Sequence, residues 1–160
     1  MTATLEVTTP SDREIAMTRS FNAPRHLVFE ALTKPELVQR WLLGPDDWTK
    51  PICEIDLRVG GRYRYVWEHP QYGRMASGGV FREIVPAERI VATEQFEEPW
   101  YPGEAIVTTT LVEHDGKTTL TMIVQHESKE VRDRVLKTGM EKGVAASYDR
   151  LAVMLEARSV

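Results

Sequence analysis

The sequence has 160 residues, a formal net charge of −4 and 42% hydrophobic residues, values typical of one globular domain. The acidic balance argues against a nucleic-acid partner, because domains that bind nucleic acids usually carry a basic face. No apolar run approaches the roughly 20 residues that span a bilayer, and residues 1–12 lack the basic and apolar regions of a secretory signal. We therefore expect a cytoplasmic protein with no nucleic-acid partner and no membrane insertion.

The amino-terminal residues 1–12 are rich in threonine and small polar residues, which predicts a flexible tail. Residues 13–158 are then expected to form a single domain. Residues 14–21 alternate in part between apolar and polar side chains, which predicts a first strand.

Two short helices are predicted directly after this strand. Asn22 is a candidate cap and Pro24 suits a first helical turn, so residues 24–33 are expected to be helical. Thr33 and Pro35 repeat the same signal for a second short helix.

Six further strands, joined by short turns, are predicted in the middle of the chain. They cover residues 52–59, 63–67, 77–85, 89–96, 104–113 and 117–125. Asp115-Gly116 between two β-branched runs is the strongest hairpin signal, because both residues tolerate a positive φ. Strands connected by short turns pair antiparallel.

One long helix is predicted from a cap at Ser128 to about residue 157. Its apolar stripe consists of Leu136, Met140, Val144, Tyr148, Leu151 and Leu155, and a row of small residues beside it consists of Gly139, Gly143 and Ala146. This helix is the one element large enough to cover a sheet face. We therefore expect an α+β domain in which a curved antiparallel sheet of about seven strands packs on the long helix around an internal cavity, closed at one end by the short helices.

Sequence motifs of catalysis and metal binding are absent. There is no serine nucleophile elbow, no phosphate-binding loop and no Cys/His pair at zinc spacing, so no catalytic residue, cofactor or metal is expected. The single cysteine, Cys53, excludes an internal disulfide and is expected to be an inert residue of the sheet.

The aromatic residues cluster in the middle third of the chain, where they form either an ordinary core or the walls of a cavity. The residues expected to line such a cavity are Trp41, Tyr65, Trp67, Phe81, Phe96, Trp100, Met122 and Met140. Glu94 and His69 are its possible polar groups, and burial of Glu94 would raise its pKa and suit it to act as a base. Rigid aromatic walls with few polar groups suit an apolar or aromatic small molecule.

Several runs of residues resemble a known family. They are 21–24, 28–33, 35–36 with 40–42, 56–63, 78–80, 84–90, and Gly143 with 149–151. Together they resemble the START-like or SRPBCC superfamily, in the branch similar to the C-terminal domain of heat-shock-protein-90 ATPase activators. The resemblance implies the helix-grip fold, with a hydrophobic cavity that in other members holds lipids, hormones or polyketides. Val144 stands where many relatives of this family have tryptophan. We expect Val144 to line the cavity, and its smaller side chain would enlarge or reshape that space.

Three functions remain open. The first is binding of an apolar small-molecule ligand by a monomer or homodimer. The second is an enzyme, such as a cyclase or hydrolase, that uses the same cavity. The third is a chaperone co-factor, for which the acidic stretch 94–115 would contact a basic partner, although a solvated sheet edge also explains that stretch.

Overall fold

A computed structural model describes residues 4–44, 47–99, 101 and 103–158. Within these residues the strands are β1 (Glu6–Thr8), β2 (Glu14–Phe21), β3 (Thr49–Ile55), β4 (Arg62–His69), β5 (Gly73–Val85), β6 (Arg89–Phe96), β7 (Ala105–His114) and β8 (Lys117–Gln125). The helices are α1 (Arg25–Thr33), α2 (Pro35–Trp41), α3 (Lys129–Lys137) and α4 (Met140–Arg158).

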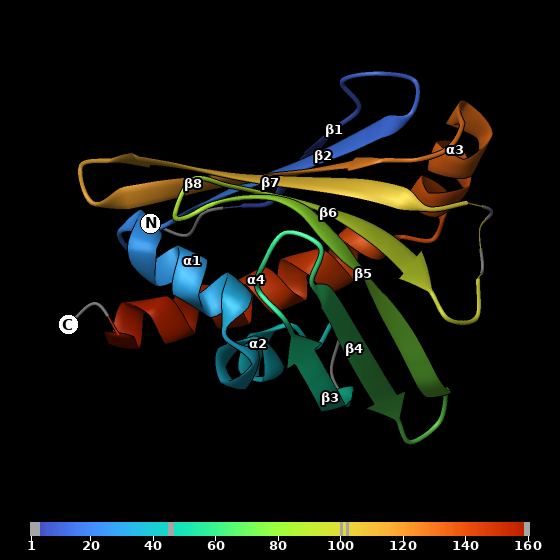
Figure 1. Cartoon of the computed structure of the whole chain (residues 1–160), viewed down its shortest axis with the longest axis horizontal. Helices are drawn as coiled ribbons and strands as arrows, with labels where there is room; N and C mark the ends of the chain where they lie inside the picture. Colours follow the sequence, from blue (N-terminus) through green and yellow to red (C-terminus); the bar gives the residue numbers. More distant parts are fainter. Residues whose placement is uncertain (1–3, 45–46, 100, 102, 159–160) are drawn as a thin grey trace.

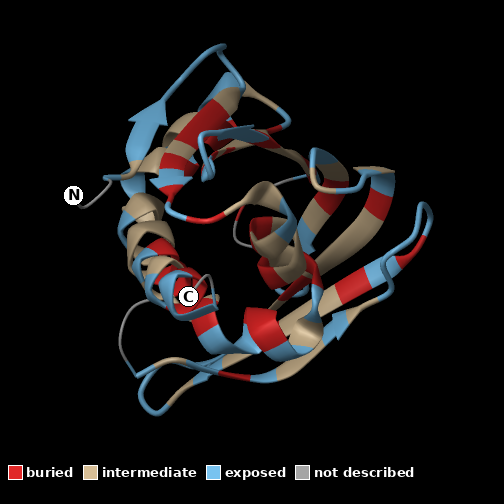
Figure 2. Ribbon diagram, turned by 90° about the vertical axis from the view of Figure 1, so that its left-hand side faces the viewer, coloured by how far each residue is buried: buried red, intermediate tan, exposed pale blue. Residues whose placement is uncertain are grey.

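The eight strands form one antiparallel sheet in the order β1-β2-β8-β7-β6-β5-β4-β3. The sheet curls around α4, and α1 and α2 lie at one end of the arrangement (Figure 1). Seen from the side, exposed residues concentrate in the turns and edges, while buried residues lie where helices and strands face one another (Figure 2). The predicted α+β helix-grip architecture is confirmed, with one strand more than expected.

The hairpin of β7 and β8 follows from its turn residues. Asp115 and Gly116 have φ values of 52° and 75°, the left-handed conformation that the sequence predicts there. His114 pairs with Lys117 on either side of the turn. Strand β8 then pairs with β2 over its whole length, which joins the amino-terminal strand to the carboxyl-terminal half of the sheet.

Several strand boundaries differ from the prediction: β3 and β5 begin earlier, at Thr49 and Gly73, and β4 is longer, covering Arg62–His69. Residues 6–8, expected in a flexible tail, form β1 and pair with residues 16–18 of β2. Strand β3 ends at Ile55, where we predicted a strand over 52–59. The chain leaves the sheet in tight turns after that residue, so Leu57 and Val59 are exposed instead of sharing an inward face with Ile55.

The helix caps also differ in part. Neither Asn22 nor Thr33 caps a helix. The N-cap residues of α1 and α2 are Pro24 and Lys34, and neither makes a side-chain capping hydrogen bond. The Thr33 hydroxyl instead donates to the Phe29 carbonyl oxygen at 2.7 Å. The expected proline at the start of α2 is confirmed.

The long terminal helix is broken into α3 and α4, which corrects the prediction of one continuous helix. Ser128 does cap its beginning, since its side chain accepts a hydrogen bond from the Val131 amide at 3.2 Å. The break lies at Thr138 and Gly139, where Gly139 has a φ of 73° that ends a right-handed helix. Gly139 is therefore a helix terminus and not a small residue inside a helix.

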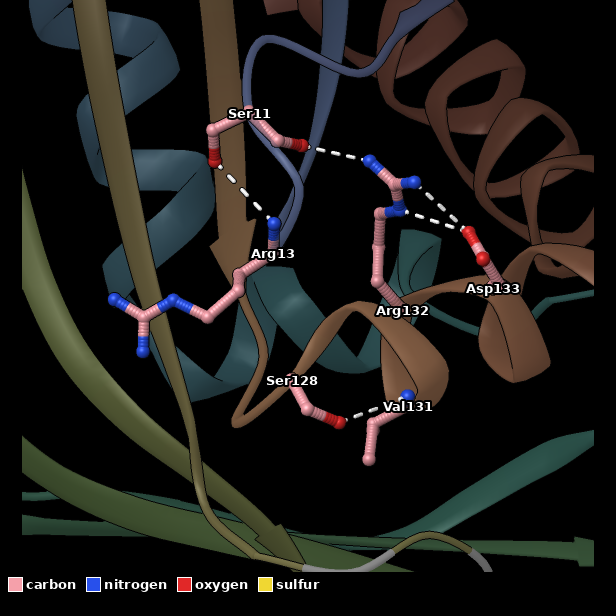
Figure 3. A network of polar contacts seen from close by, with 6 residues as sticks. All are labelled: Ser11, Arg13, Ser128, Val131, Arg132 and Asp133. Atoms are coloured by element: carbon pink, nitrogen blue, oxygen red, sulfur yellow. Dashed lines mark hydrogen bonds and ion pairs between the residues drawn. The ribbon is translucent and has the colours of Figure 1, made fainter.

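A buried arginine anchors α3 to the chain before β2 (Figure 3). Arg132 donates to the carbonyl oxygen of Ser11 at 2.6 Å and to the carboxylate of Asp133 at 2.9 and 3.1 Å. Because Arg132 is buried, these charge-assisted bonds hold α3 in a defined position beside the sheet.

The buried apolar residues fall into three clusters rather than one. One joins β2 and β8 to α1, α2 and α4 around Phe21, Leu120 and Leu151. A second lies under α3 around Ile15 and Val135, and a third lies between β4, β5 and β6. None of the helices in the described residues is both long and apolar enough to cross a membrane.

Strand β5 approaches its neighbours so closely that it requires glycine. A Cβ atom on Gly79 would overlap the backbone carbonyl of Thr93, and one on Gly78 would overlap the carbonyl of Tyr63. The Thr93 hydroxyl also accepts a hydrogen bond from the Val80 amide at 2.9 Å, close to the register shift between β5 and β6.

We predict that Gly79→Ala destabilises the protein by about 3 kcal/mol, because the added methyl group meets backbone that cannot rotate away. Arg82→Ala, on an exposed position of the same strand, is the control and should change stability by no more than about 1 kcal/mol. Urea denaturation measures both. Equal stability of the two variants would contradict the close approach.

Candidate functional site

A cavity of about 560 Å³ lies between the inner face of the sheet and the helices. Its size falls within the range of small-molecule sites. Eight of the expected cavity residues border it: Trp41, Tyr65, Trp67, Phe81, Phe96, Met122, Met140 and Val144. Trp100 lies outside the described residues. Glu94 also borders the cavity.

Aromatic rings form one continuous wall of the cavity. Tyr63, Tyr65 and Trp67 alternate along β4 and point to the same side, with successive ring centroids 5.1 and 5.8 Å apart. Phe81 of β5 extends this row, since its ring centroid is 5.4 Å from that of Tyr63. Neighbouring rings are tilted against one another by 43° to 75°, so the wall is continuous and aromatic but not flat.

Hydrogen bonds fix two of these rings in orientation. The Tyr63 hydroxyl donates to the carbonyl oxygen of Thr93 at 2.6 Å. The Trp67 indole donates to the carbonyl oxygen of Leu42 at 2.9 Å, which ties the wall to the end of α2. The polar atoms of both rings are therefore used by the fold, and their apolar surfaces face the cavity.

The opposite wall comes from α4. Met140, Gly143, Val144, Ser147 and Tyr148 border the cavity at successive turns of this helix. Glycine and valine are small for positions that face an aromatic wall, so space remains between helix and sheet. The Ser147 hydroxyl accepts a hydrogen bond from the backbone amide of Gly44, shortly after α2. This bond holds the helices together, so the hydroxyl already has a structural partner.

Glu94 of β6 supplies a carboxyl group to this apolar space. Its side chain is half-buried and borders the cavity. Desolvation raises the pKa of Glu94 from 4.5 to about 7. The group therefore holds a mixture of acid and carboxylate forms near neutral pH, as the sequence predicts for a buried glutamate.

His126 is a second polar group of the cavity, and we did not predict it. Only 3% of its surface is exposed, and among the described residues neither ring nitrogen has a hydrogen-bond partner. Burial lowers the pKa of His126, so its imidazole is neutral. The ring of Tyr101 meets it edge-on, with centroids 5.2 Å apart.

His69 does not belong to the cavity, which corrects its prediction as a polar cavity group. Its Nδ1 atom accepts hydrogen bonds from the amides of Gln71 and Tyr72 at 3.0 and 3.2 Å. Its ring packs between those of Trp48 and Tyr72. His69 therefore shapes the turn between β4 and β5.

A buried lysine lies beside the aromatic wall. Lys50 of β3 is 5% exposed, and its Nζ atom lies 4.1 Å from the ring centroid of Tyr65 and 4.5 Å from that of Trp67. Among the described residues this atom has no hydrogen-bond partner. Desolvation lowers the pKa of Lys50 to about 7, while the two ring faces favour its charged form.

The neighbouring Cys53 has a raised thiol pKa, chiefly because of burial, with Lys50 acting in the opposite direction. A raised pKa keeps the thiol protonated and poorly nucleophilic at neutral pH.

The alternation of inward residues in the sequence could have placed His126 in the cavity, but it could not have placed Lys50. Leu120, Met122 and Val124 point inward from β8, and His126 is the next position in that alternation. The pattern of β3 is interrupted between Thr49 and Ile52, where the register shifts, so alternation does not place Lys50.

The outer face of β3 to β6 carries a larger but open groove of about 860 Å³. Its acidic residues Glu97 and Glu104 each pair with an arginine of β4 or β5. Arg64 donates to both carboxylate oxygens of Glu97 at 2.8 and 3.1 Å, and Arg82 lies 3.5 Å from Glu104. These acidic residues of the 94–115 stretch are thus neutralised. We place the site in the inner cavity, where both ring nitrogens of His126 lack a partner among the described residues.

Within the described residues, no three histidine, cysteine or acidic side chains gather in a way that could hold a metal ion.

Comparison with known proteins places the chain among similar sequences and structures. The family model described as "Activator of Hsp90 ATPase homolog 1-like protein" matches residues 22–156. A crystal structure of a protein from Rhodobacter sphaeroides is 29% identical with a TM-score of 0.90, and the match covers 96% of this chain and 99% of that one. No curated protein matches the chain.

Two further solved structures share the fold. Protein CV1439 from Chromobacterium violaceum is 28% identical, with a TM-score of 0.76 over 91% of this chain and 99% of that one. The solution structure of an Activator of Hsp90 ATPase homolog 1-like protein from Aeromonas hydrophila is 15% identical, with a TM-score of 0.72 over 88% and 93% of the two chains.

Glu94→Gln should remove a pH dependence of stability. The unfolded chain releases the Glu94 proton near pH 4.5 and the folded protein holds it to about pH 7, so wild-type stability falls as the pH rises between these values. The variant should match the wild type near pH 4 and exceed its free energy of unfolding by up to about 3 kcal/mol at pH 8. Urea denaturation across this range measures the difference, and parallel curves for the two proteins would contradict burial of the carboxyl.

Lys50→Met should show the opposite trend. The unfolded chain keeps Lys50 charged up to about pH 10.5 and the folded protein only up to about pH 7, so the wild type loses stability as the pH falls between these values. The stabilisation by methionine should therefore be larger at pH 6.5 than at pH 10. Chemical denaturation at both values tests this, and a gain that is independent of pH would count against a desolvated amine.

Proposed function

Because the chain belongs to the family of Activator of Hsp90 ATPase homolog 1-like proteins, whose START-like fold encloses a cavity here, we propose that it binds an apolar or aromatic small molecule inside that cavity. The protein would act in the cytoplasm as a monomer or homodimer. The observation that carries this proposal is the space of about 560 Å³ between the aromatic wall of β4 and the small residues of α4.

The composition of the wall supports an apolar ligand. Each Å² of apolar surface that a ligand buries against this wall contributes about 25 cal/mol to the free energy of transfer from water. Hydrogen bonds already hold the rings of Tyr63 and Trp67 in orientation, so a ligand would order little of this wall on binding. An aromatic or alicyclic molecule matches such a surface better than a polar one.

One observation favours a second function, catalysis in the same cavity. A carboxyl group with a pKa of about 7 in a water-poor space is suited to general acid–base chemistry on a bound molecule. Glu94 would be the acting group of a cyclase or hydrolase. Conversion of a bound compound by the wild type but not by Glu94→Gln, with binding retained, would distinguish this function from binding alone.

A cavity-filling substitution tests the binding function. Val144→Trp should weaken binding of an uncharged apolar dye such as Nile red by about tenfold or more, because the indole occupies space between α4 and the wall. Dye fluorescence titration measures the affinity.

Val153→Trp, at a position of the same helix that is 69% exposed, is the matched control and should bind the dye like the wild type. Unchanged affinity in Val144→Trp, or no saturable binding by the wild type, would contradict the proposal.

A further inference from the structure

We propose that one end of the cavity, formed by Glu94 and His126, binds the hydroxyl group of a neutral and otherwise apolar ligand, such as a phenol or an alicyclic alcohol. This inference rests on the proposed binding function and specifies the chemistry of the ligand.

The register of the sheet places these two side chains at the same end. Glu94 of β6 pairs with Ala105 of β7, and Ile106 pairs with Gln125 of β8, so His126 follows at the level of Ala105. Glu94 and His126 therefore flank Ala105, which offers only a methyl group between them. Both border the cavity.

Tyr101 brings the two groups into a common environment. Its ring meets His126 edge-on with centroids 5.2 Å apart, and the charge of Glu94 contributes to a raised pKa of Tyr101 after burial. Tyr101 is itself buried and also packs edge-on against Phe96. The polar end is thus closed by aromatic rings.

The hydrogen-bonding capacity of this end is unused. Neutral imidazole has one donor and one acceptor nitrogen, and in the described part of the chain both nitrogens of His126 lack a partner. Glu94 adds a carboxyl group that borders the same cavity. A buried polar group without a partner costs free energy, which a bound group with matching atoms would recover.

A hydroxyl group matches this pair because it donates one hydrogen bond and accepts another. A carboxylate ligand would bring a second acid group beside Glu94. An ammonium ligand would have to share the aromatic wall with Lys50, whose Nζ atom already lies against the rings of Tyr65 and Trp67. Either charged ligand would also lose hydration in an apolar space, so a neutral hydroxyl is favoured.

Matched naphthalene probes test the inference by calorimetric titration at pH 6. The wild type should bind 2-naphthol about tenfold more tightly than 2-methylnaphthalene, because only the naphthol supplies the hydroxyl. His126→Phe and Glu94→Leu should each bring this ratio close to one, because neither new side chain can bond the hydroxyl. Saturable binding of 2-methylnaphthalene by both variants shows that they fold. Glu94→Gln should retain the preference, because its amide both donates and accepts.

Thr109→Val is the matched control. Thr109 also borders the cavity but lies four residues from Ala105 along β7, roughly 13 Å away at the rise of a strand. Its substitution should leave the ratio unchanged.

Three results would overturn the inference. Equal wild-type affinity for 2-naphthol and 2-methylnaphthalene would contradict the proposed hydroxyl-binding site, but it would be consistent with the proposed binding function. Tighter binding of 2-naphthoic acid or 2-naphthylmethylamine than of 2-naphthol would show a charged ligand class. Binding of none of the probes would overturn the proposed function, and the inference with it.

Discussion

The close approach of β5 to its neighbours is the constraint on which the cavity depends. Gly79 stands opposite Tyr63 in the pairing of β4 with β5, and a Cβ atom there would overlap the Thr93 carbonyl. The Tyr63 hydroxyl bonds to that same carbonyl, across the space that the missing side chain leaves. The first ring of the aromatic wall is therefore held against the sheet because the strand beside it carries glycine. The rings of Tyr65 and Trp67 follow from the alternation of β4.

Two polar groups of the cavity and the lysine beside its aromatic wall work against the stability of the empty fold. Burial raises the pKa of Glu94 and lowers the pKa of His126 and of Lys50, so desolvation favours the neutral form of each group. Apolar side chains at these positions would avoid the cost of desolvation. Functional sites commonly retain groups that the fold alone does not favour, and on the proposed function a ligand would supply the missing contacts. The surrounding apolar clusters offset their cost.

Local sequence signals predicted the architecture well where one residue type dictates the backbone. Asp115-Gly116 fixed the hairpin, Pro35 marked the start of α2 and Ser128 marked the start of α3. The break at Gly139 was missed because an apolar stripe continues across it, and periodicity alone does not reveal one residue of positive φ.

Most of the cavity wall was predictable because inward positions alternate along regular strands. The rings of β4 follow this alternation, whereas Glu94 was named only as a possible polar group of the cavity. His126 was within reach of the same argument, one position beyond the end of β8. Lys50 was not, because a register shift in β3 hides its direction, and His69 was misplaced because a strand end gives no reliable side. The pattern fails where strands become irregular.

The break between α3 and α4 has a consequence for how the pocket can diversify. Arg132 fastens α3 to the segment before β2, whereas α4 packs on α1 and α2 at the other end of the molecule. Gly139 and Met140, at the joint, both border the cavity. The two helices α3 and α4, each anchored separately, thus meet at the cavity. Substitutions that shift the joint can reshape the interior without disturbing either anchor, so one scaffold can accommodate differently shaped molecules while its framework stays constant.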